Sequence, residues 1–234
     1  MYNFAHSMKF FAILKMKLVV TILLMLPFGV VNLIGQSVPE RAAEARGRTI
    51  LEATRNKLKT FQALRFHFTY TMENTQQNIT ETLKGEFLVQ GDRYFMTLGN
   101  NRFISDGITT WSYMAELNEV YINLLANDQE TLTPTSILND FEEKFRARHV
   151  RQETQNGRRV EIIDLTPIGA HLFFKYRVAI DSNTGMVVST TAHDREGGTF
   201  TYRIDRVETN PRIPQGTFRF NAQEFPGIEV VDLR

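Results

Sequence analysis

The chain has 234 residues, with 27 basic and 26 acidic side chains and no cysteine. Its net charge of +1 excludes the strong field of one sign that proteins use to bind nucleic acid or an anionic membrane surface. The absence of cysteine excludes disulfide bonds, thiolate zinc sites and a lipid-bearing cysteine.

The first 35 residues have the order of a secretion leader. Three lysines precede an uncharged and mostly apolar run over residues 18–35, which is typical of a signal peptide. We expect cleavage near Gln36; an uncleaved membrane anchor is the alternative, because this run is at the lower limit of a bilayer span. Met16 would itself begin an ordinary leader, so residues 1–15 are interpreted as an over-extension of the start.

The part after the leader is predicted to be one domain over residues 36–234. Without residues 1–35 the chain has 24 basic and 26 acidic residues, a net charge of −2. This length suits a single all-β sandwich or barrel better than two small domains. We therefore expect an exported, nearly neutral protein with one core.

The first element predicted after the leader is an amphipathic helix over residues 39–64. Its apolar positions recur at intervals of one, three and four with charged residues between them, and we expect it to cover an apolar surface. These positions are Ile50, Leu51, Thr54, Leu58 and Phe61.

Large apolar side chains then alternate with polar ones over residues 66–122. Such alternation indicates strands of a half-buried antiparallel sheet. Gly91-Asp92, Asn100-Asn101 and Asp106-Gly107 are spaced as its hairpin turns. One face is predicted to be apolar. Its side chains include Phe66, Phe68, Tyr70, Phe87, Val89, Tyr94, Met96, Trp111 and Tyr113.

A second helix interrupts the strands between residues 124 and 148. Thr133-Pro134 is typical of a helix start, and Ile137, Leu138, Phe141 and Phe145 fall on one face. Further strands are predicted at residues 150–153, 159–166, 173–181, 186–192, 200–207 and 217–221, and residues 227–233 are a candidate edge strand. About ten or eleven strands exceed what a flat sheet holds, so we expect the sheet to curl. Side chains could fill its interior as an ordinary core. Alternatively, helices could plug the interior and move away to admit a ligand.

Catalytic and metal-binding patterns are missing from the sequence. Four histidines of the predicted domain are isolated from one another, namely His67, His149, His171 and His193. Neither a Gly-x-Ser-x-Gly elbow nor a phosphate-binding glycine loop is present. We therefore expect no enzyme, no metal and no cofactor.

Several segments resemble the periplasmic outer-membrane lipoprotein carriers of the LolA family, in a version like that of the Bacteroidota. They are LKTFQALRFHFTYT, LKGEFLVQGDRYFMTL, SDGITTWSY and TFRFNAQEFPGIEVVDLR. SDGITTWSY, residues 105–113, is similar to the family's Ser-Asp-Gly-x-x-x-Trp-x-Tyr pattern. The segments follow the family's order over about 170 residues.

This resemblance implies a mainly β fold, an incomplete (half-open) antiparallel β-barrel closed by a lid of two or three helices. It implies a periplasmic monomer that takes acylated lipoproteins from an inner-membrane exporter complex to an outer-membrane acceptor. The nine apolar side chains named above would line the acyl cavity, with Ile137, Leu138 and Phe141 on the lid. Many carriers latch the lid with an Arg-Pro pair before the Gly-x-Arg turn; here Arg93 is the nearest substitute.

Other functions stay open at this point. A regulatory module on the same fold would bind lipid or lipoprotein and signal to a membrane partner, and an enzyme acting on envelope lipids is a third hypothesis. An aromatic residue at strand spacing is also compatible with ordinary core packing. Only the resemblance favours an acyl cavity over a filled core.

Overall fold

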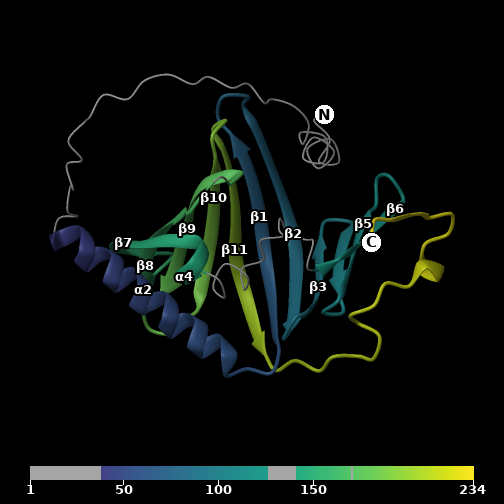
Figure 1. The fold of residues 1–234 in the computed structure, drawn as a ribbon, viewed down its shortest axis with the longest axis horizontal. Helices are drawn as coiled ribbons and strands as arrows, with labels where there is room; N and C mark the ends of the chain where they lie inside the picture. The colour runs from purple at the N-terminus through teal and green to yellow at the C-terminus, as the bar shows by residue number, and fades with distance from the viewer. Residues whose placement is uncertain (1–37, 126–140, 170) are drawn as a thin grey trace, which may run out of the picture. The chain divides into compact units, whose positions relative to one another are not determined.

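The computed structural model describes residues 38–125, 141–169 and 171–234 of the chain. These residues form a mainly β structure with few helices (Figure 1). The elements, in chain order, are α2 (Val38–Lys59), β1 (Leu64–Asn74), β2 (Ile79–Gln90), β3 (Arg93–Leu98), β4 (Asn101–Ser105), β5 (Thr109–Met114), β6 (Glu119–Leu124), α4 (Phe141–Lys144), β7 (Phe145–Gln155), β8 (Arg158–Pro167), β9 (Phe173–Asp181), β10 (Val187–Asp194), β11 (Gly198–Thr209), the 3-10 helix η2 (Ala222–Glu224) and β12 (Glu229–Asp232).

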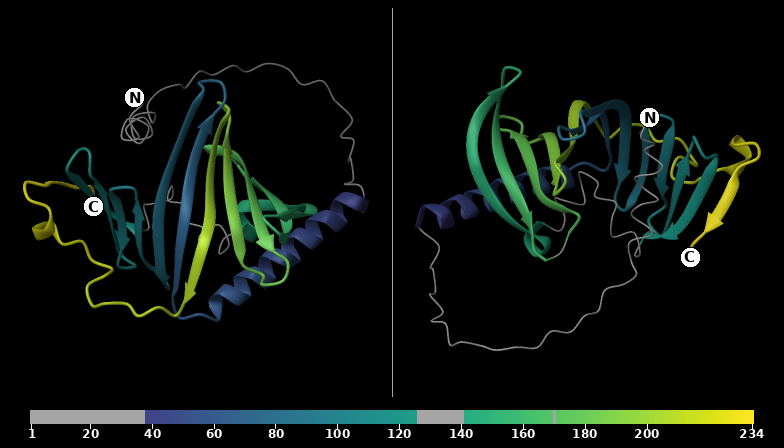
Figure 2. Two further views of the ribbon diagram at one scale, coloured as in Figure 1. Left: turned by 180° about the vertical axis from the view of Figure 1, so that it is seen from behind. Right: turned by 90° about the horizontal axis from the view of Figure 1, so that it is seen from above.

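The strands form one sheet in the order β12-β6-β5-β4-β3-β2-β1-β11-β10-β9-β8-β7. Strands β1 to β6 follow one another as antiparallel neighbours, and so do β7 to β11; the two series meet where β1 pairs with β11. Strand β12 pairs with β6 in parallel. Because β12 and β7 are edge strands, the sheet is open. Figure 2 shows that it is bent rather than flat, as expected for a twisted sheet of this many strands.

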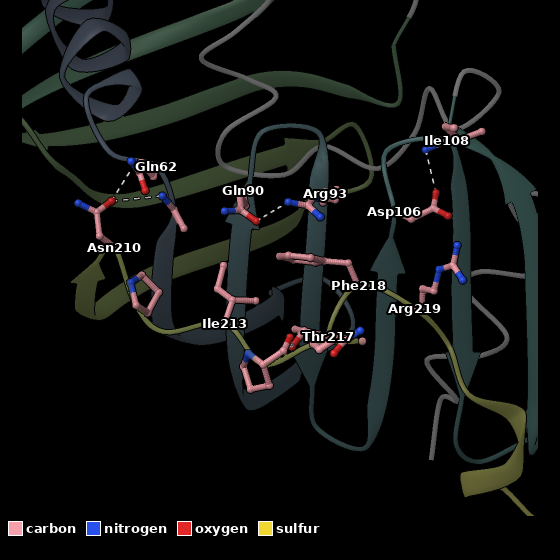
Figure 3. Close-up of a pocket in the computed structure, with 15 residues that line it drawn as sticks. Gln62, Gln90, Arg93, Asp106, Ile108, Asn210, Ile213, Thr217, Phe218 and Arg219 are labelled. Atoms are coloured by element: carbon pink, nitrogen blue, oxygen red, sulfur yellow. Dashed lines mark hydrogen bonds between the residues drawn. The ribbon is translucent and has the colours of Figure 1, made fainter.

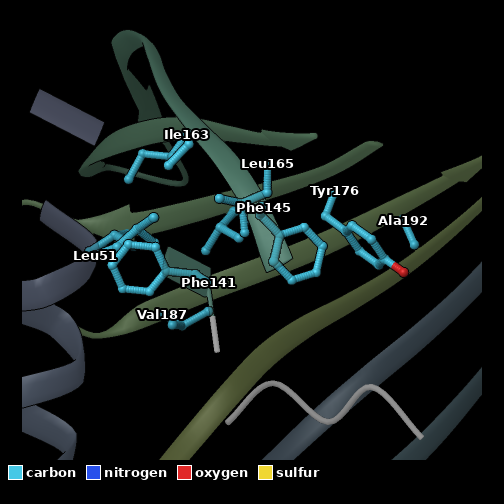
Figure 4. Close-up of a cluster of buried hydrophobic side chains, with 11 residues drawn as sticks. Leu51, Phe141, Phe145, Ile163, Leu165, Tyr176, Val187 and Ala192 are labelled. Atoms are coloured by element: carbon cyan, nitrogen blue, oxygen red, sulfur yellow. The ribbon is translucent and has the colours of Figure 1, made fainter. Parts of the chain in front are cut away.

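Helix α2 packs on one face of the strands near the β7 edge. Leu51 is fully buried in the same apolar cluster as Ile163 of β8 and Val178 of β9 (Figure 4). A Cβ atom added at Gly47 would lie 2.8 Å from the backbone nitrogen of His149, so glycine lets the helix approach β7 closely. The face that Leu51 contacts is named the helix face, and the other side of the sheet is the opposite face.

The hairpin turns follow the predicted chemistry with one shift. Gly91-Asp92 joins β2 to β3, and Asp106-Gly107 lies between β4 and β5. The turn between β3 and β4 is Gly99-Asn100, one residue earlier than predicted. Gly99 has φ +57°, a left-handed conformation that glycine adopts without steric cost.

The predicted elements differ from the described part of the structure in four further places. Helix α2 ends at Lys59, before the predicted end at residue 64, and the sheet has twelve strands rather than ten or eleven. Of the second helix, the described residues contain the single turn α4, and Phe145 already begins β7. The prediction of a strand at residues 217–221 is wrong, because Gly216 takes φ +85° and the chain turns there.

No helix among the described residues is both long and apolar enough to cross a membrane.

Candidate functional site

An apolar row crosses the helix face from β1 to β4. Phe66 pairs with Phe87, Phe87 with Met96, and Met96 with Phe103. Residues paired directly across neighbouring strands point to the same face of a sheet. The row is flanked on one side by Leu64, Val89 and Tyr94, which are also paired in register.

The same face continues without interruption to the cluster under α2. Met72 of β1 pairs with Phe200 of β11, Phe200 with Ala192 of β10, and Ala192 with Tyr176 of β9. Tyr176 and Ala192 belong to the cluster that contains Leu51 (Figure 4). The aromatic row and the helix-covered cluster are therefore two parts of one apolar surface.

The side chains of this surface are packed against one another. Phe66 and Phe87 stack with ring centroids 6.2 Å apart, and Phe87 is 1% exposed. The rings of Phe68 and Tyr70 lie 5.5 and 5.0 Å from that of Tyr202. Burial raises the pKa of Tyr202 to about 12, so its hydroxyl stays neutral at physiological pH.

A glycine makes room for one of these rings. A Cβ atom at Gly85 would overlap the ring of Phe68 and the carbonyl oxygen of Thr97. Phe68 pairs with Gly85 across β1 and β2, so the absence of a side chain on β2 allows the ring to lie flat over that strand. The apolar surface thus depends on a small residue as well as on large ones.

The nine predicted lining residues do not all share one face. Seven lie on the helix face, whereas Trp111 pairs with Ile104 and Tyr113 pairs with Arg102, on the opposite face. The helix-face residue Phe103 pairs instead with Ser112, which separates Trp111 from Tyr113 in the sequence. The seven residues of the helix face are Phe66, Phe68, Tyr70, Phe87, Val89, Tyr94 and Met96.

On the opposite face, Tyr113 is covered by the C-terminal segment, residues 210–227. Its ring centroid lies 6.2 Å from Phe220 and 4.2 Å from Phe225. The guanidinium of Arg102 lies 4.9 Å from the centroid of Phe225. These contacts form a separate aromatic cluster on the opposite face of β4 and β5. They explain why these strands carry apolar residues at positions that point to this face.

Arg93, the predicted latch, also contacts the C-terminal segment. Its guanidinium donates a hydrogen bond to Gln90 Oε1 at 2.5 Å and lies 5.1 Å from the ring centroid of Phe218. All three residues line a half-open cavity of about 880 Å³ together with Arg219 and Asp106 (Figure 3). Charged and amide groups share the lining of this cavity with apolar side chains such as Ile108 and Ile213.

The predicted lid residues fall partly outside the described chain. Ile137 and Leu138 lie outside the described residues, while Phe141 begins α4 and is 1% exposed. Phe141 packs in the cluster with Leu51. Arg55 of α2 lies over the Phe141 ring at 5.3 Å and donates two hydrogen bonds to the Glu142 carboxylate at 3.2 and 3.3 Å. The two helices are therefore held to each other by Arg55.

A second ion pair ties α2 to the sheet, and it was not predicted. Arg46 donates hydrogen bonds to both oxygens of Glu161 at 3.3 and 3.2 Å, and His149 Nε2 lies 2.7 Å from Glu161 Oε2. Burial raises the pKa of Glu161, but the hydrogen bonds from His149 and Gln152 and the charge of Arg46 outweigh it and lower the pKa. The carboxylate is thus stabilised in its charged form under α2.

The described residues contain no group of three or more histidine, aspartate or glutamate side chains placed to hold a metal ion. The helix face offers apolar contact area, aromatic rings and a flexible methionine, Met96. Such surfaces suit alkyl chains of variable shape. Among the described charged groups on this face, Arg46, Arg55, Glu142 and Glu161 lie where the helices meet the sheet, and Glu81 pairs with Met72 at the far end of β1.

Known proteins resemble the chain in sequence profile and in fold. The profile described as outer membrane lipoprotein carrier protein LolA matches residues 56–221. No curated protein sequence matches the chain.

Solved structures resemble the chain at low sequence identity. An uncharacterised conserved protein from Thermus thermophilus has a TM-score of 0.54 and 10% identity, covering 80% of this chain and 99% of that chain. The LolA superfamily protein NE2245 from Nitrosomonas europaea gives a TM-score of 0.42 and 9% identity, covering 74% and 97%. The MucA/MucB complex of Pseudomonas aeruginosa gives 0.36 and 14%, covering 78% and 62%.

Proposed function

Because the chain belongs to the LolA family of outer membrane lipoprotein carrier proteins, we propose that it binds the acyl chains of lipoproteins on the helix face. It then carries them from the inner membrane to the outer membrane. The observation that supports this proposal best is the apolar row from Phe66 to Phe103, which continues to the cluster under α2. An acyl chain could lie along this row once the row is uncovered.

The energetics of an acyl chain require such a surface. A chain of about 15 methylenes gains ~0.8 kcal/mol for each methylene removed from water, more than ~10 kcal/mol in total. A lipoprotein therefore does not cross an aqueous compartment unaided at a useful concentration. A carrier must offer apolar contact close to that of a bilayer and then release the chain.

Helices α2 and α4 suit the role of a movable cover. Leu51 and Phe141 fill the apolar surface at the β7 end, and the Arg55–Glu142 and Arg46–Glu161 ion pairs hold the helices at its margin. The Arg55–Glu142 pair is partly exposed, and such ion pairs contribute little to stability. Apolar packing closes the cover, and an acyl chain can replace that packing with contacts of the same kind.

The proposed carrier works outside the cytoplasm. Residues 1–35 would serve as its signal peptide and residues 36–234 as one carrier domain in the periplasm. N-terminal sequencing of the protein from the periplasmic fraction should then begin near Gln36. Recovery at full length in the inner-membrane fraction would favour the anchored alternative.

Mass spectrometry of protein isolated from its own cells tests the proposal. We expect triacylated lipoproteins to copurify with the wild-type protein and to pass to lipid vesicles that contain outer-membrane components. A protein isolated without lipoprotein that also binds no fatty-acyl probe would contradict the proposal. Stable binding of acyl chains without any transfer would favour the lipid-sensing regulatory module instead.

A further inference from the structure

The hairpin end between β8 and β9 exposes three large apolar side chains. Ile168 and Leu172 are each 50% exposed and Phe174 is 43% exposed. Isolated apolar residues on a surface are ordinary, but a group of them marks a contact site. These three residues are named the apolar tip.

Basic side chains gather on the opposite face beside the apolar tip. Arg148 pairs with Asp164, and Asp164 pairs with Arg177, so the three lie side by side across β7, β8 and β9. Arg146 and Lys175 lie on the same face, each two residues nearer to the hairpin end than Arg148 and Arg177. The basic patch is defined as Arg146, Arg148, Lys175 and Arg177.

The carboxylate of Asp164 lies within the basic patch, and three of its cations act on it. Asp164 accepts hydrogen bonds from Arg177 at 2.7 and 2.9 Å. Burial raises the pKa of Asp164, but Arg177 and the charges of Lys175 and Arg148 outweigh it and lower the pKa. Glu153 also acts on Arg177, so the four cations outnumber the two carboxylates and leave a local excess of positive charge, although residues 36–234 together carry a net charge of −2.

The apolar tip and the basic patch are in direct contact. The ammonium of Lys175 lies 5.8 Å from the ring centroid of Phe174. On the other side of the hairpin, the backbone N–H of Ile168 donates a hydrogen bond at 2.8 Å to the carbonyl of Lys144, two residues before Arg146. Exposed apolar groups and cations therefore meet at one end of the sheet.

We propose that this end docks the protein on an anionic phospholipid bilayer, with the apolar tip in the headgroup region and the basic patch on lipid phosphates. Basic side chains next to exposed apolar ones favour a charged lipid surface over a purely apolar partner. Docking goes beyond the proposed carrier function, and it uses no residue that lines the proposed acyl-binding surface.

Vesicle flotation tests the docking. The full mature protein is mixed with phosphatidylcholine vesicles that contain about one third phosphatidylglycerol, or none. We expect binding to the anionic vesicles, reduced by salt because exposed charges are screened. Each cation near such a surface changes binding about fivefold, so the Arg146→Glu, Lys175→Glu double variant should bind at least about tenfold more weakly. Leu172→Ser with Phe174→Ser should also weaken binding.

Matched controls come from the C-terminal segment and the β4–β5 turn. Arg212→Glu with Arg219→Glu changes the net charge by the same amount, and Ile108→Ser removes an apolar side chain that is 72% exposed. We expect these variants to bind vesicles like the wild type. Circular dichroism and binding of a fluorescent fatty-acyl probe should be unchanged in every variant, so a failure of docking is distinguishable from a failure of the carrier proposal.

Three results would overturn the proposal. They are equal binding to neutral and anionic vesicles, equal loss of binding in the control variants, and no binding to either kind of vesicle. In the third case, binding to native membrane vesicles but not to vesicles of their extracted lipids would identify a protein receptor as the partner instead.

Discussion

Two neighbouring residues of β3, Phe95 and Met96, lie on different faces of the sheet and are both half-buried. Met96 pairs with Phe87 and Phe103 in the apolar row, while Phe95 pairs with Leu88 and Ile104 on the opposite face. The same substitution at these two positions therefore distinguishes an acyl-binding face from ordinary core.

Met96→Glu should weaken binding of a fluorescent fatty-acyl probe by more than about tenfold, because a carboxylate beside an alkyl chain costs several kcal/mol. Phe95→Glu should change the dissociation constant much less. Fluorescence titration gives both values, and circular dichroism checks that both variants fold. Equal loss of affinity in the two variants would show that the row is not the binding surface.

Glu161 should make the stability of the protein depend on pH. Its pKa in the folded state is lowered from the ordinary value of 4.5, so its contribution is present above that pH and is lost as the pH falls through the folded-state pKa. Glu161→Gln should lose about 1–3 kcal/mol of unfolding free energy at neutral pH, and the difference from wild type should shrink below about pH 4. Urea unfolding at several pH values measures this. A difference independent of pH would exclude the charged contact with Arg46 and His149.

At the scale of elements, Arg55 controls how α4 is held to α2. Arg55→Glu places two carboxylates together and removes the cation over the Phe141 ring, so α4 should loosen and the acyl probe should associate severalfold faster. Combining it with Glu142→Arg restores the ion pair in reverse and should bring the rate back toward wild type. Stopped-flow fluorescence measures the rates. Unchanged association in both variants would make the two helices a fixed part of the core.

The strands were largely predictable because alternation and turn chemistry are local signals. Which face the alternate side chains of a strand point to depends on its register with the neighbouring strand. The sequence does not show this register, so the prediction that Trp111 and Tyr113 share a face with Phe66 is wrong. Phe218 and Phe220 alternate like a strand but pack on the opposite face of the sheet without ladder hydrogen bonds, after a turn at Gly216.

Contacts between distant residues left no sequence pattern. Arg46 and Glu161 are 115 positions apart, and neither stands in a motif. The resemblance to carriers suggests a latch at Arg93, whose contacts in the described part of the chain are with Gln90 and the C-terminal segment. In each case the missing information is which residues meet across the fold.

At the scale of the whole molecule, the net charge gives no indication of the basic patch. Nearly equal numbers of acids and bases argue against an anionic surface as a partner. The register of β7, β8 and β9 nevertheless gathers the four cations of the basic patch on one face. A property averaged over the chain does not show how charge is distributed over its surface.

If the protein is a carrier, the acyl chains of lipoproteins bind to one surface, the helix face. Photocrosslinking in the native cells tests the cargo and the surface together. A photoreactive phenylalanine analogue is placed at Met96 or Phe103 on the helix face, and at Phe95 or Trp111 on the opposite face. We expect lipoprotein adducts from the first pair and few or none from the second, identified by mass spectrometry after irradiation. Equal adducts from both pairs, or adducts from Phe95 and Trp111 alone, would contradict the account.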